Sequence, residues 1–152
     1  MKSRAGFLPA LSIIACLLAT AGGTALAAPA SPAGLWRTID DETGQARSLV
    51  RIEESAGQVS GRVERILTPG KEDARCEACT GDLQNQPIVG MTILQGLKAG
   101  EDGYEGGTIL DPNNGKTYRC QLWLDDDGKK LNVRGYIGLP VFGRSQTWHR
   151  AD

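Results

Sequence analysis

The sequence is poor in histidine and in aromatic residues, and both shortages limit what the chain can do. One of its 152 residues is histidine, and Trp, Tyr and Phe together make up 5%. A single histidine argues against zinc sites built on several of them, and it leaves a serine or cysteine nucleophile with one candidate base. With so few aromatic side chains, the core of any fold must be mostly aliphatic.

A strong net charge is also missing. The chain has 17 Lys and Arg against 18 Asp and Glu, which gives a formal net charge of -1. These basic residues are scattered along the sequence, so the basic patch of a nucleic-acid-binding protein is not present. We therefore expect no nucleic-acid partner.

The longest stretch without charge is near the N-terminus. Lys2 and Arg4 precede the uncharged, mostly apolar residues 6–19, and Ala25-Leu26-Ala27 matches the small-residue sequence at which signal peptides are cleaved. We expect residues 1–27 to be a secretory signal peptide, which would place the protein in the periplasm or outside the cell. The chain would then carry no transmembrane span.

Two alternatives compete for this N-terminus. A membrane span needs about 20 apolar residues, and the run here is shorter. Lipoprotein processing at Cys16 is less favoured, because the sequence stays apolar after the cysteine. Cleavage after Ala27 removes two positive charges and no negative ones, so the net charge changes from -1 to -3.

The rest of the chain reads as strands joined by turns. Residues 28–33 form a short Ala/Pro/Ser linker, and residues 34–152 suit one domain. No segment shows a convincing helical period, and no internal repeat is present. Alternating or apolar segments predict about eight strands, at residues 34–40, 48–53, 58–66, 88–97, 104–110, 116–124, 131–137 and 144–150. The expected fold is all-β, a small up-and-down antiparallel barrel.

Residues 67–87 interrupt this regular succession of strands and short turns, and they contain Cys76-Glu77-Ala78-Cys79. The segment is longer than the loop of about two to five residues in an ordinary hairpin. A disulfide between Cys76 and Cys79 is favoured in an exported protein. A redox site would need a βαβ context, and a zinc site would need more ligands than His149 and Cys120 supply. Cys120 is in phase with apolar neighbours and is predicted to be buried, with pairing to a loop cysteine as the alternative.

Several motifs resemble those of known families. Gly34-x-Trp36 together with a late arginine resembles the end-closing pair of lipocalins and other calycins. A closer resemblance, over residues 34–150, is to an uncharacterised exported bacterial family, domain of unknown function 2147. The motifs that carry it are Gly34-Leu35-Trp36-Arg37-Thr38-Ile39-Asp40-Asp41, Cys76-x-x-Cys79-x-Gly81, Ile109-Leu110-Asp111-Pro112-x-Asn114-Gly115-Lys116-Thr117-Tyr118, Val133-Arg134-Gly135-Tyr136-Ile137-Gly138 and Gly143-Arg144-Ser145-Gln146-x-Trp148. The resemblance implies a lipocalin-like barrel with no established activity.

The two ends of this domain are expected to meet. If the sheet closes, Trp36 in the first strand and Arg144 in the last become neighbours, and the guanidinium can lie over the indole with a cation–π attraction of roughly 0.5–2 kcal/mol. We predict that this pair closes one end of the barrel. Ligand contact at the barrel mouth is the less favoured role for it.

Arg134 and Tyr136 are the most specific candidates for binding the acidic group of a ligand. Residues two apart share a strand face, so both side chains can reach one carboxylate or phosphate. The pair resembles the Arg-x-Tyr pair of intracellular fatty-acid carriers. The competing interpretation takes Leu131, Val133 and Ile137 as the core face, which puts Arg134 and Tyr136 outside the barrel.

Enzyme chemistry finds little support, and no cofactor is expected. His149 is predicted to lie at the surface, on a face with Ser145 and Thr147. The acidic runs Asp40-Asp41 and Asp125-Asp126-Asp127 fall in turns, where aspartate accepts hydrogen bonds from backbone amides. Neither matches a calcium-binding EF-hand loop.

Two functions remain open. The favoured one is an exported carrier or sensor of a small apolar or amphipathic ligand such as a fatty acid. Its cavity would be lined by Val50, Ile52, Met91, Ile93, Tyr118, Leu122 and Val133. The alternative is an envelope protein-interaction module with a filled barrel, acting through its surface loops, above all residues 67–87. Cavity volume should separate the two.

Overall fold

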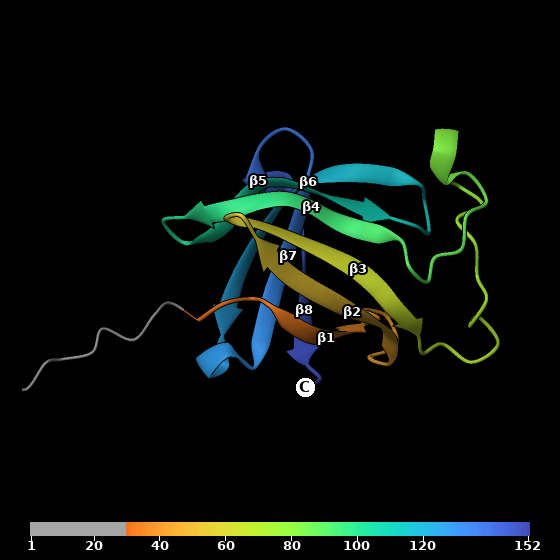
Figure 1. Cartoon of the computed structure of the whole chain (residues 1–152), viewed down its shortest axis with the longest axis horizontal. Helices are drawn as coiled ribbons and strands as arrows, with labels where there is room; N and C mark the ends of the chain where they lie inside the picture. Colours follow the sequence, from red (N-terminus) through yellow and green to blue (C-terminus); the bar gives the residue numbers. More distant parts are fainter. Residues whose placement is uncertain (1–29) are drawn as a thin grey trace, which may run out of the picture.

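The structure is a computed structural model that describes residues 30–152. Eight strands form one closed antiparallel barrel, in which each strand pairs with the next in sequence and the last pairs with the first (Figure 1). The strands are β1 (Gly34–Ile39), β2 (Ala46–Ser55), β3 (Gln58–Ile66), β4 (Thr92–Gly100), β5 (Gly103–Asp111), β6 (Lys116–Asp125), β7 (Lys130–Tyr136) and β8 (Arg144–Arg150). Three 3-10 turns join them, η1 (Gly81–Leu83), η2 (Asp126–Gly128) and η3 (Pro140–Phe142). The predicted all-β barrel is confirmed. No helix among residues 30–152 has the length and apolar character to cross a membrane.

The up-and-down order gives the barrel two different ends. At the first, which we call the turn end, short connections join β2 to β3, β4 to β5 and β6 to β7. At the second, the loop end, the connections are residues 40–45, 67–91, 112–115 and 137–143. The long connection 67–91 stands at the right of Figure 1. A binding site that opens to solvent has most connecting chain available to it at the loop end.

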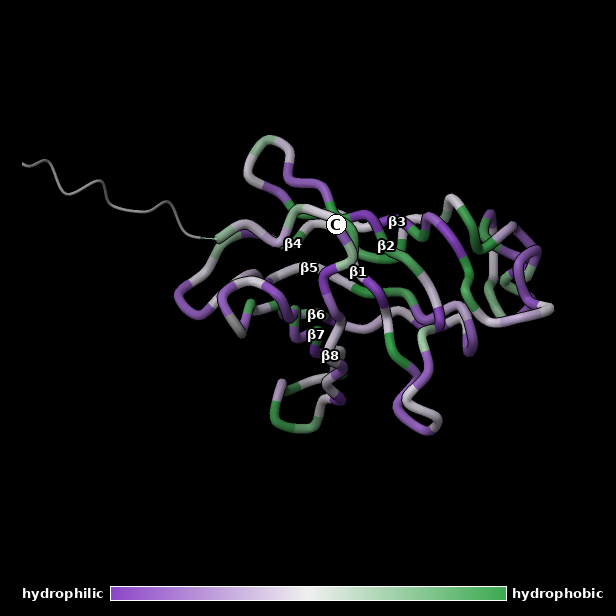
Figure 2. Tube along the Cα trace, turned by 90° about the horizontal axis from the view of Figure 1, so that it is seen from below, coloured by the Kyte–Doolittle hydropathy of each residue, from purple (hydrophilic) through white to green (hydrophobic). Residues whose placement is uncertain are grey.

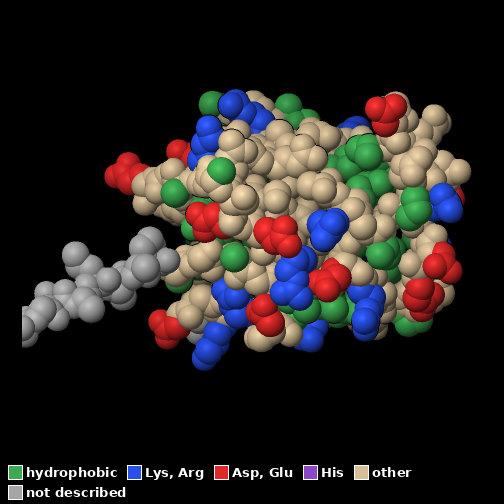
Figure 3. All heavy atoms as spheres, in the orientation of Figure 1, with side chains coloured by type: hydrophobic (Ala, Val, Ile, Leu, Met, Phe, Trp, Pro, Cys, Tyr) green, Lys and Arg blue, Asp and Glu red, His purple; other side chains and the backbone are tan. Residues whose placement is uncertain are grey.

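The core lies inside the barrel and is mostly aliphatic, as the composition predicts. Alternate residues of each strand point inward, and the most deeply buried of them are less than 4% exposed. They are Trp36, Val50, Ile52, Val59, Val63, Leu94, Leu97, Cys120, Leu122, Leu131, Val133 and Trp148. The same alternation puts charges on the outer face, and the side of the molecule in Figure 3 mixes both signs without a broad basic field.

The fourth strand differs from its predicted position. It begins at Thr92 rather than at residue 88, and Val89 is 41% exposed. The pairing of β3 with β4 shifts register on both sides of Gly61, and at each shift β4 has one residue more than β3. A side chain at Gly61 would meet Leu94, because a Cβ there would lie 2.9 Å from Leu94 Cδ1. Two adjacent residues, Ile93 and Leu94, are both buried beside these register shifts.

The seventh strand ends one residue earlier than predicted. Leu131 and Val133 are buried, as predicted, but Ile137 lies beyond β7 and is 71% exposed. The apolar face assigned to this strand was therefore one residue too long. Ile137 belongs to the connection between β7 and β8.

Candidate functional site

The turn end of the barrel is closed by Trp36 and Arg150. The Arg150 guanidinium carbon lies 4.3 Å from the centroid of the Trp36 ring. The indole Nε1 donates a 2.7 Å hydrogen bond to the Pro32 carbonyl. Trp36 is fully buried, so the indole and the segment before β1 seal this end.

Arg150 also ties two backbone segments to β8. Its guanidinium donates to the carbonyl oxygens of Gly128, Ala33 and Ser31, at 2.7, 3.1 and 3.4 Å. These carbonyls belong to the β6–β7 turn and to the segment that enters β1. One cation therefore holds both the start and the end of the barrel.

Arg144 does not close the barrel with Trp36, so that prediction is wrong. Arg144 lies at the other end of β8, six residues before Arg150, and its Nη2 donates to Asp41 Oδ2 at 2.8 Å. The side chain is 74% exposed. Because β8 runs antiparallel to β1, Trp36 pairs in register with Arg150.

A polar layer covers the loop end of the interior. Arg144 pairs with Gly135 and Gln146 with the buried Val133, and cross-strand partners share a face, so both side chains stand on the inward face of β8. Gln146 Nε2 also donates to Asp41 Oδ2, at 3.2 Å. Two donors from one strand thus converge on a single carboxylate oxygen.

The layer continues around the rim. Trp148 Nε1 donates to Gln146 Oε1 at 3.4 Å, and the hydroxyls of Thr38 and Ser48 are 2.8 Å apart. Every buried side-chain nitrogen and oxygen of the described residues has a hydrogen-bond partner. Below this layer the inward residues are apolar, so the interior changes from polar to apolar within one two-residue period of the strands.

Tyr118 connects this layer to the β5–β6 turn. Its hydroxyl accepts a 3.0 Å hydrogen bond from Asn114 Nδ2, and its side chain is partly exposed. Asp111 holds the turn by accepting from the backbone N–H of Asn113 at 2.9 Å and from Asn114 Nδ2 at 3.0 Å. This turn belongs to the longest motif that the sequence offered.

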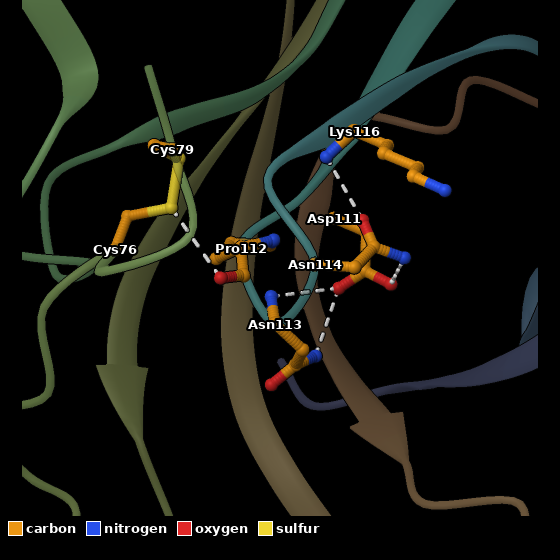
Figure 4. Close-up of a disulfide and its surroundings, with 7 residues drawn as sticks. All are labelled: Cys76, Cys79, Asp111, Pro112, Asn113, Asn114 and Lys116. Atoms are coloured by element: carbon orange, nitrogen blue, oxygen red, sulfur yellow. Dashed lines mark hydrogen bonds between the residues drawn. A yellow bond between two sulfur atoms is a disulfide. The ribbon is translucent and has the colours of Figure 1, made fainter.

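The disulfide predicted between Cys76 and Cys79 is present and packs on the same turn (Figure 4). Both cysteines are at least 97% buried, and Cys76 Sγ lies 3.3 Å from the Pro112 carbonyl oxygen. The Asn85 and Cys79 amides each donate to the Cys76 carbonyl, at 2.9 and 3.3 Å. The 67–91 connection is therefore stapled and packed against the barrel.

Arg134 and Tyr136 are in the outward phase of β7, which is the competing interpretation of the sequence, but Tyr136 is buried there, at 8% exposure, beside Gly143. Val133 points into the core, and Arg134 pairs with Ser145 and Gln121 on the opposite face. The Arg134 guanidinium holds the connection to β8, since Nε donates to the Pro140 carbonyl at 2.6 Å and Nη1 donates to Ser145 Oγ at 2.8 Å. The pair does not converge on a ligand inside the barrel.

The other predicted ligand residues divide into two groups. Leu122, Val133, Met91 and Ile93 are 1–7% exposed and form part of the packed core. Of these residues, only Tyr118 lies at the polar layer of the loop end. Two hollows of residues 30–152 lie on the outer surface, and the larger of them, about 550 Å³, runs between outward side chains such as Glu105, Trp123 and Arg134.

Residues 34–150 match the model of a family described as an uncharacterized protein conserved in bacteria, DUF2147. The chain belongs to this family. A search of curated proteins finds no match. Among solved structures, protein HP1028 from the human pathogen Helicobacter pylori, described as belonging to the lipocalin family, matches with a TM-score of 0.69 and 22% identity. The match covers 80% of this chain and 84% of that one, and it shows that this DUF2147 chain has the lipocalin fold.

His149 and the acidic β1–β2 turn of this DUF2147 protein lie where the sequence predicts. His149 stands on the outer face with Arg37 and Lys130 as register partners, as predicted. Backbone and side-chain hydrogen bonds from Thr43 lower the pKa of Asp40, which caps the β1–β2 turn as predicted. Residues 30–152 contain no group of three His, Cys, Asp or Glu side chains that could hold a metal ion.

Cys120 is buried as predicted and is the free cysteine of this part of the chain. Burial raises the pKa of its thiol from 9.0 to about 12. Since the thiolate is the reactive form, a pKa three units higher lowers its fraction at pH 8 by about a thousandfold. We expect iodoacetamide at pH 8 to leave Cys120 unmodified in the folded protein and to alkylate it quickly in urea. Peptide mapping by mass spectrometry checks this, and fast labelling without urea would show that Cys120 is accessible.

Proposed function

We propose that the protein is an exported, lipocalin-like binding protein that takes a small amphipathic ligand with an acidic group at its loop end. The observation that carries the proposal is the convergence of Arg144 and Gln146 on one carboxylate oxygen at the open end of a barrel whose other end is sealed. Arginine with a second polar donor is the usual protein recognition of a carboxylate. Without ligand, the Asp41 carboxylate accepts the two hydrogen bonds that we assign to the ligand's acidic group.

The apolar part of such a ligand has a surface beside these donors. Ile109 and Tyr118 are partly buried and lie around Gly135, where a Cβ would be 3.4 Å from Ile109 Cγ2 and 3.5 Å from Tyr118 Cβ. The ligand would rest on this part of the interior, above the packed core. Deeper entry would require the core side chains to move apart.

Export is supported by the disulfide, because disulfides persist in oxidising compartments. The predicted signal peptide over residues 1–27 lies outside the described residues. Carriage or sensing fits the arrangement better than catalysis, because Cys120 is buried and His149 stands on the outer face.

The experiment that tests the proposal measures the affinity for a fluorescent long-chain fatty acid and its displacement by oleate. We expect Arg144→Gln to weaken binding about tenfold or more, because a charged hydrogen bond to the ligand is lost. Asp41→Ala should strengthen binding by up to about fivefold, since it frees both donors from an exposed ion pair. Arg65→Gln, on an exposed arginine of the outer surface, is the matched control and should change nothing.

Two results would contradict the site. One is a wild-type protein that binds no fatty acid probe, and the other is binding that is equally strong in Arg144→Gln and in Arg65→Gln. Opposite effects at Arg144 and Asp41 would be hard to obtain from a general loss of structure. The pair therefore separates ligand contact from stability.

The second candidate function, an envelope protein-interaction module, is favoured by a different observation. The inward residues below the polar layer are packed, and the larger hollow lies outside the barrel. A filled barrel that acts through its loops needs no ligand. Failure of all fatty-acid binding would favour this function.

A further inference from the structure

The larger hollow on the outer surface is a groove between two unlike walls. We call it the outer groove, and it is lined by residues 101–105, 121–123, 134 and 140–141. Its floor is the outer face of β5, β6 and β7, one wall is the β4–β5 turn, and the other is the connection between β7 and β8. Its volume of about 550 Å³ lies within the range of about 300–1,000 Å³ that is usual for binding pockets.

The wall formed by the β4–β5 turn is acidic. Glu101, Asp102 and Glu105 are exposed, line the groove and belong to none of the ion pairs within the described part of the chain. Arg134 is the basic residue of the lining, and its guanidinium already donates to two backbone carbonyls of the opposite wall. Three carboxylates and one guanidinium give the lining a formal charge of -2. Lys98, the register partner of Glu105, lies on β4, outside the floor of the groove.

The opposite wall is apolar and exposed. Val141 lines the groove and is 71% exposed, while its neighbours in the same connection, Leu139 and Phe142, are 63% and 80% exposed. The connection projects from the barrel as a green loop below β7 and β8 in Figure 2. Its backbone has a defined conformation, since the Phe142 amide donates to the Leu139 carbonyl at 3.1 Å. Soluble proteins rarely expose large apolar side chains together unless the surface contacts a partner.

Trp123 lies on the floor between the two walls. It is partly buried and stands on the outer face of β6 with Gln121, whose Nε2 donates to Glu105 Oε2 at 3.4 Å. The face of an indole attracts cations and also offers apolar contact area. Since β5 and β7 are two interstrand spacings apart, or about 10 Å, an occupant that contacts both walls must be longer than a single ammonium ion.

We propose that the outer groove binds a segment of a partner protein in which a lysine or arginine stands next to apolar residues. The cation lies against the carboxylates of the β4–β5 turn and the indole of Trp123, and the apolar side chains cover Val141. An anionic segment would be repelled by the acidic wall, and an uncharged one would leave the carboxylates without a partner. The groove is separate from the proposed ligand site, because Asp41, Arg144 and Gln146 do not line it.

Peptide binding tests this assignment. The protein from Ala28 onward holds all eight strands and the closed barrel. Its affinity is measured by fluorescence anisotropy for three short labelled peptides, which alternate lysine with leucine, lysine with serine, or glutamate with leucine. We expect the lysine–leucine peptide to bind most tightly, because it alone offers both a cation and an apolar side chain to the groove.

Two variants of the groove should weaken the binding of this peptide. Glu101→Gln with Asp102→Asn removes two carboxylates of the acidic wall, and we expect a loss of about fivefold or more. Val141→Ser removes an apolar contact of the opposite wall, and we expect a loss of about threefold or more. Because all three side chains are exposed, both variants should unfold at the same temperature as the wild type.

The 67–91 connection supplies a matched control for each variant. Glu72→Gln with Asp73→Asn changes the same two residue types in the same order, and both of these side chains are exposed. Val89→Ser repeats the apolar change at a valine that is 41% exposed. Both controls should bind the lysine–leucine peptide as the wild type does.

Three results would overturn the assignment. The first is a wild-type protein that does not bind the lysine–leucine peptide, and the second is an equal loss in the groove variants and their controls. The third is a lysine–serine peptide that binds as tightly as the lysine–leucine one, because the apolar wall would then have no part in binding. The groove variants should keep the wild-type affinity for the fluorescent fatty acid, so failure at one site is distinguishable from failure at the other.

Discussion

Replacing Trp36 with alanine is expected to lower the free energy of unfolding by about 3–5 kcal/mol, the range for removal of a buried large aromatic side chain. Trp36 is 0% exposed, stacks against the Arg150 guanidinium and donates to the Pro32 carbonyl. Its loss leaves a cavity at the turn end and frees the cation that ties β8 to the segment before β1. Urea unfolding followed by circular dichroism measures the change.

Trp123→Ala is the control, because this tryptophan is only partly buried and stands on the outer face of β6. We expect a loss of roughly 1 kcal/mol there. The two arginines supply a second comparison. Arg150→Ala should cost roughly 2 kcal/mol, whereas Arg144→Ala should cost at most about 1, as an exposed ion pair does. Equal losses at the two tryptophans, or a greater loss at Arg144 than at Arg150, would mean that Trp36 and Arg150 do not close the barrel.

The eight strands could be predicted because alternation records which face is buried. In β6, Cys120 and Leu122 face the core exactly as their spacing predicts, since a period of two is imposed by the strand itself. The position of β4 could not be found in this way. Its pairing with β3 shifts on both sides of Gly61, where β4 has an extra residue each time, so its buried residues do not alternate: Ile93 and Leu94 are both buried.

The closing arginine was misassigned for a reason that the topology makes clear. Arg144 and Arg150 are six residues apart and share the inward face of β8, so spacing cannot separate them. Direction can: in a closed antiparallel barrel, the beginning of the first strand lies beside the end of the last one. Trp36 stands near the beginning of β1 and therefore needs the arginine nearest the end of β8. The positions of the two arginines along the last strand therefore identify the closing one, but only once the sheet is known to close.

The polar layer at the loop end was the part that sequence reasoning missed. Gln146 and Asp41 belong to different segments, 105 residues apart, and each has an ordinary interpretation on its own. What joins them is the register between β7 and β8 and the course of the β1–β2 turn. The spacing of Arg134 with Tyr136 is visible in the sequence, whereas the carbonyls of Pro140 and Val141 that Arg134 binds are not.

The second large effect is expected at Gly115, where alanine should lower the free energy of unfolding by about 2–4 kcal/mol. Gly115 has φ of +69°, a conformation that costs a residue with a side chain roughly 1–2 kcal/mol. A Cβ on its present backbone would also lie 2.0 Å from the Ala78 carbonyl oxygen, between the two cysteines of the disulfide. Because that obstacle is backbone held by the disulfide, the 67–91 connection must move away from the β5–β6 turn.

Gly44→Ala separates the cost of the backbone conformation from the cost of the contact with Ala78. Gly44 has the same φ of +69°, but a Cβ there meets nothing within 4 Å, so its substitution carries the backbone cost alone. Urea unfolding should therefore show a loss of about 1–2 kcal/mol for Gly44→Ala and a clearly larger one for Gly115→Ala. Trypsin should also cut after Lys71 or Arg75 faster in Gly115→Ala than in Gly44→Ala, because the displaced connection exposes those bonds. If the two glycines respond alike in both measurements, the contact with Ala78 contributes nothing, and the stapled connection is held to the barrel by its buried cysteines alone.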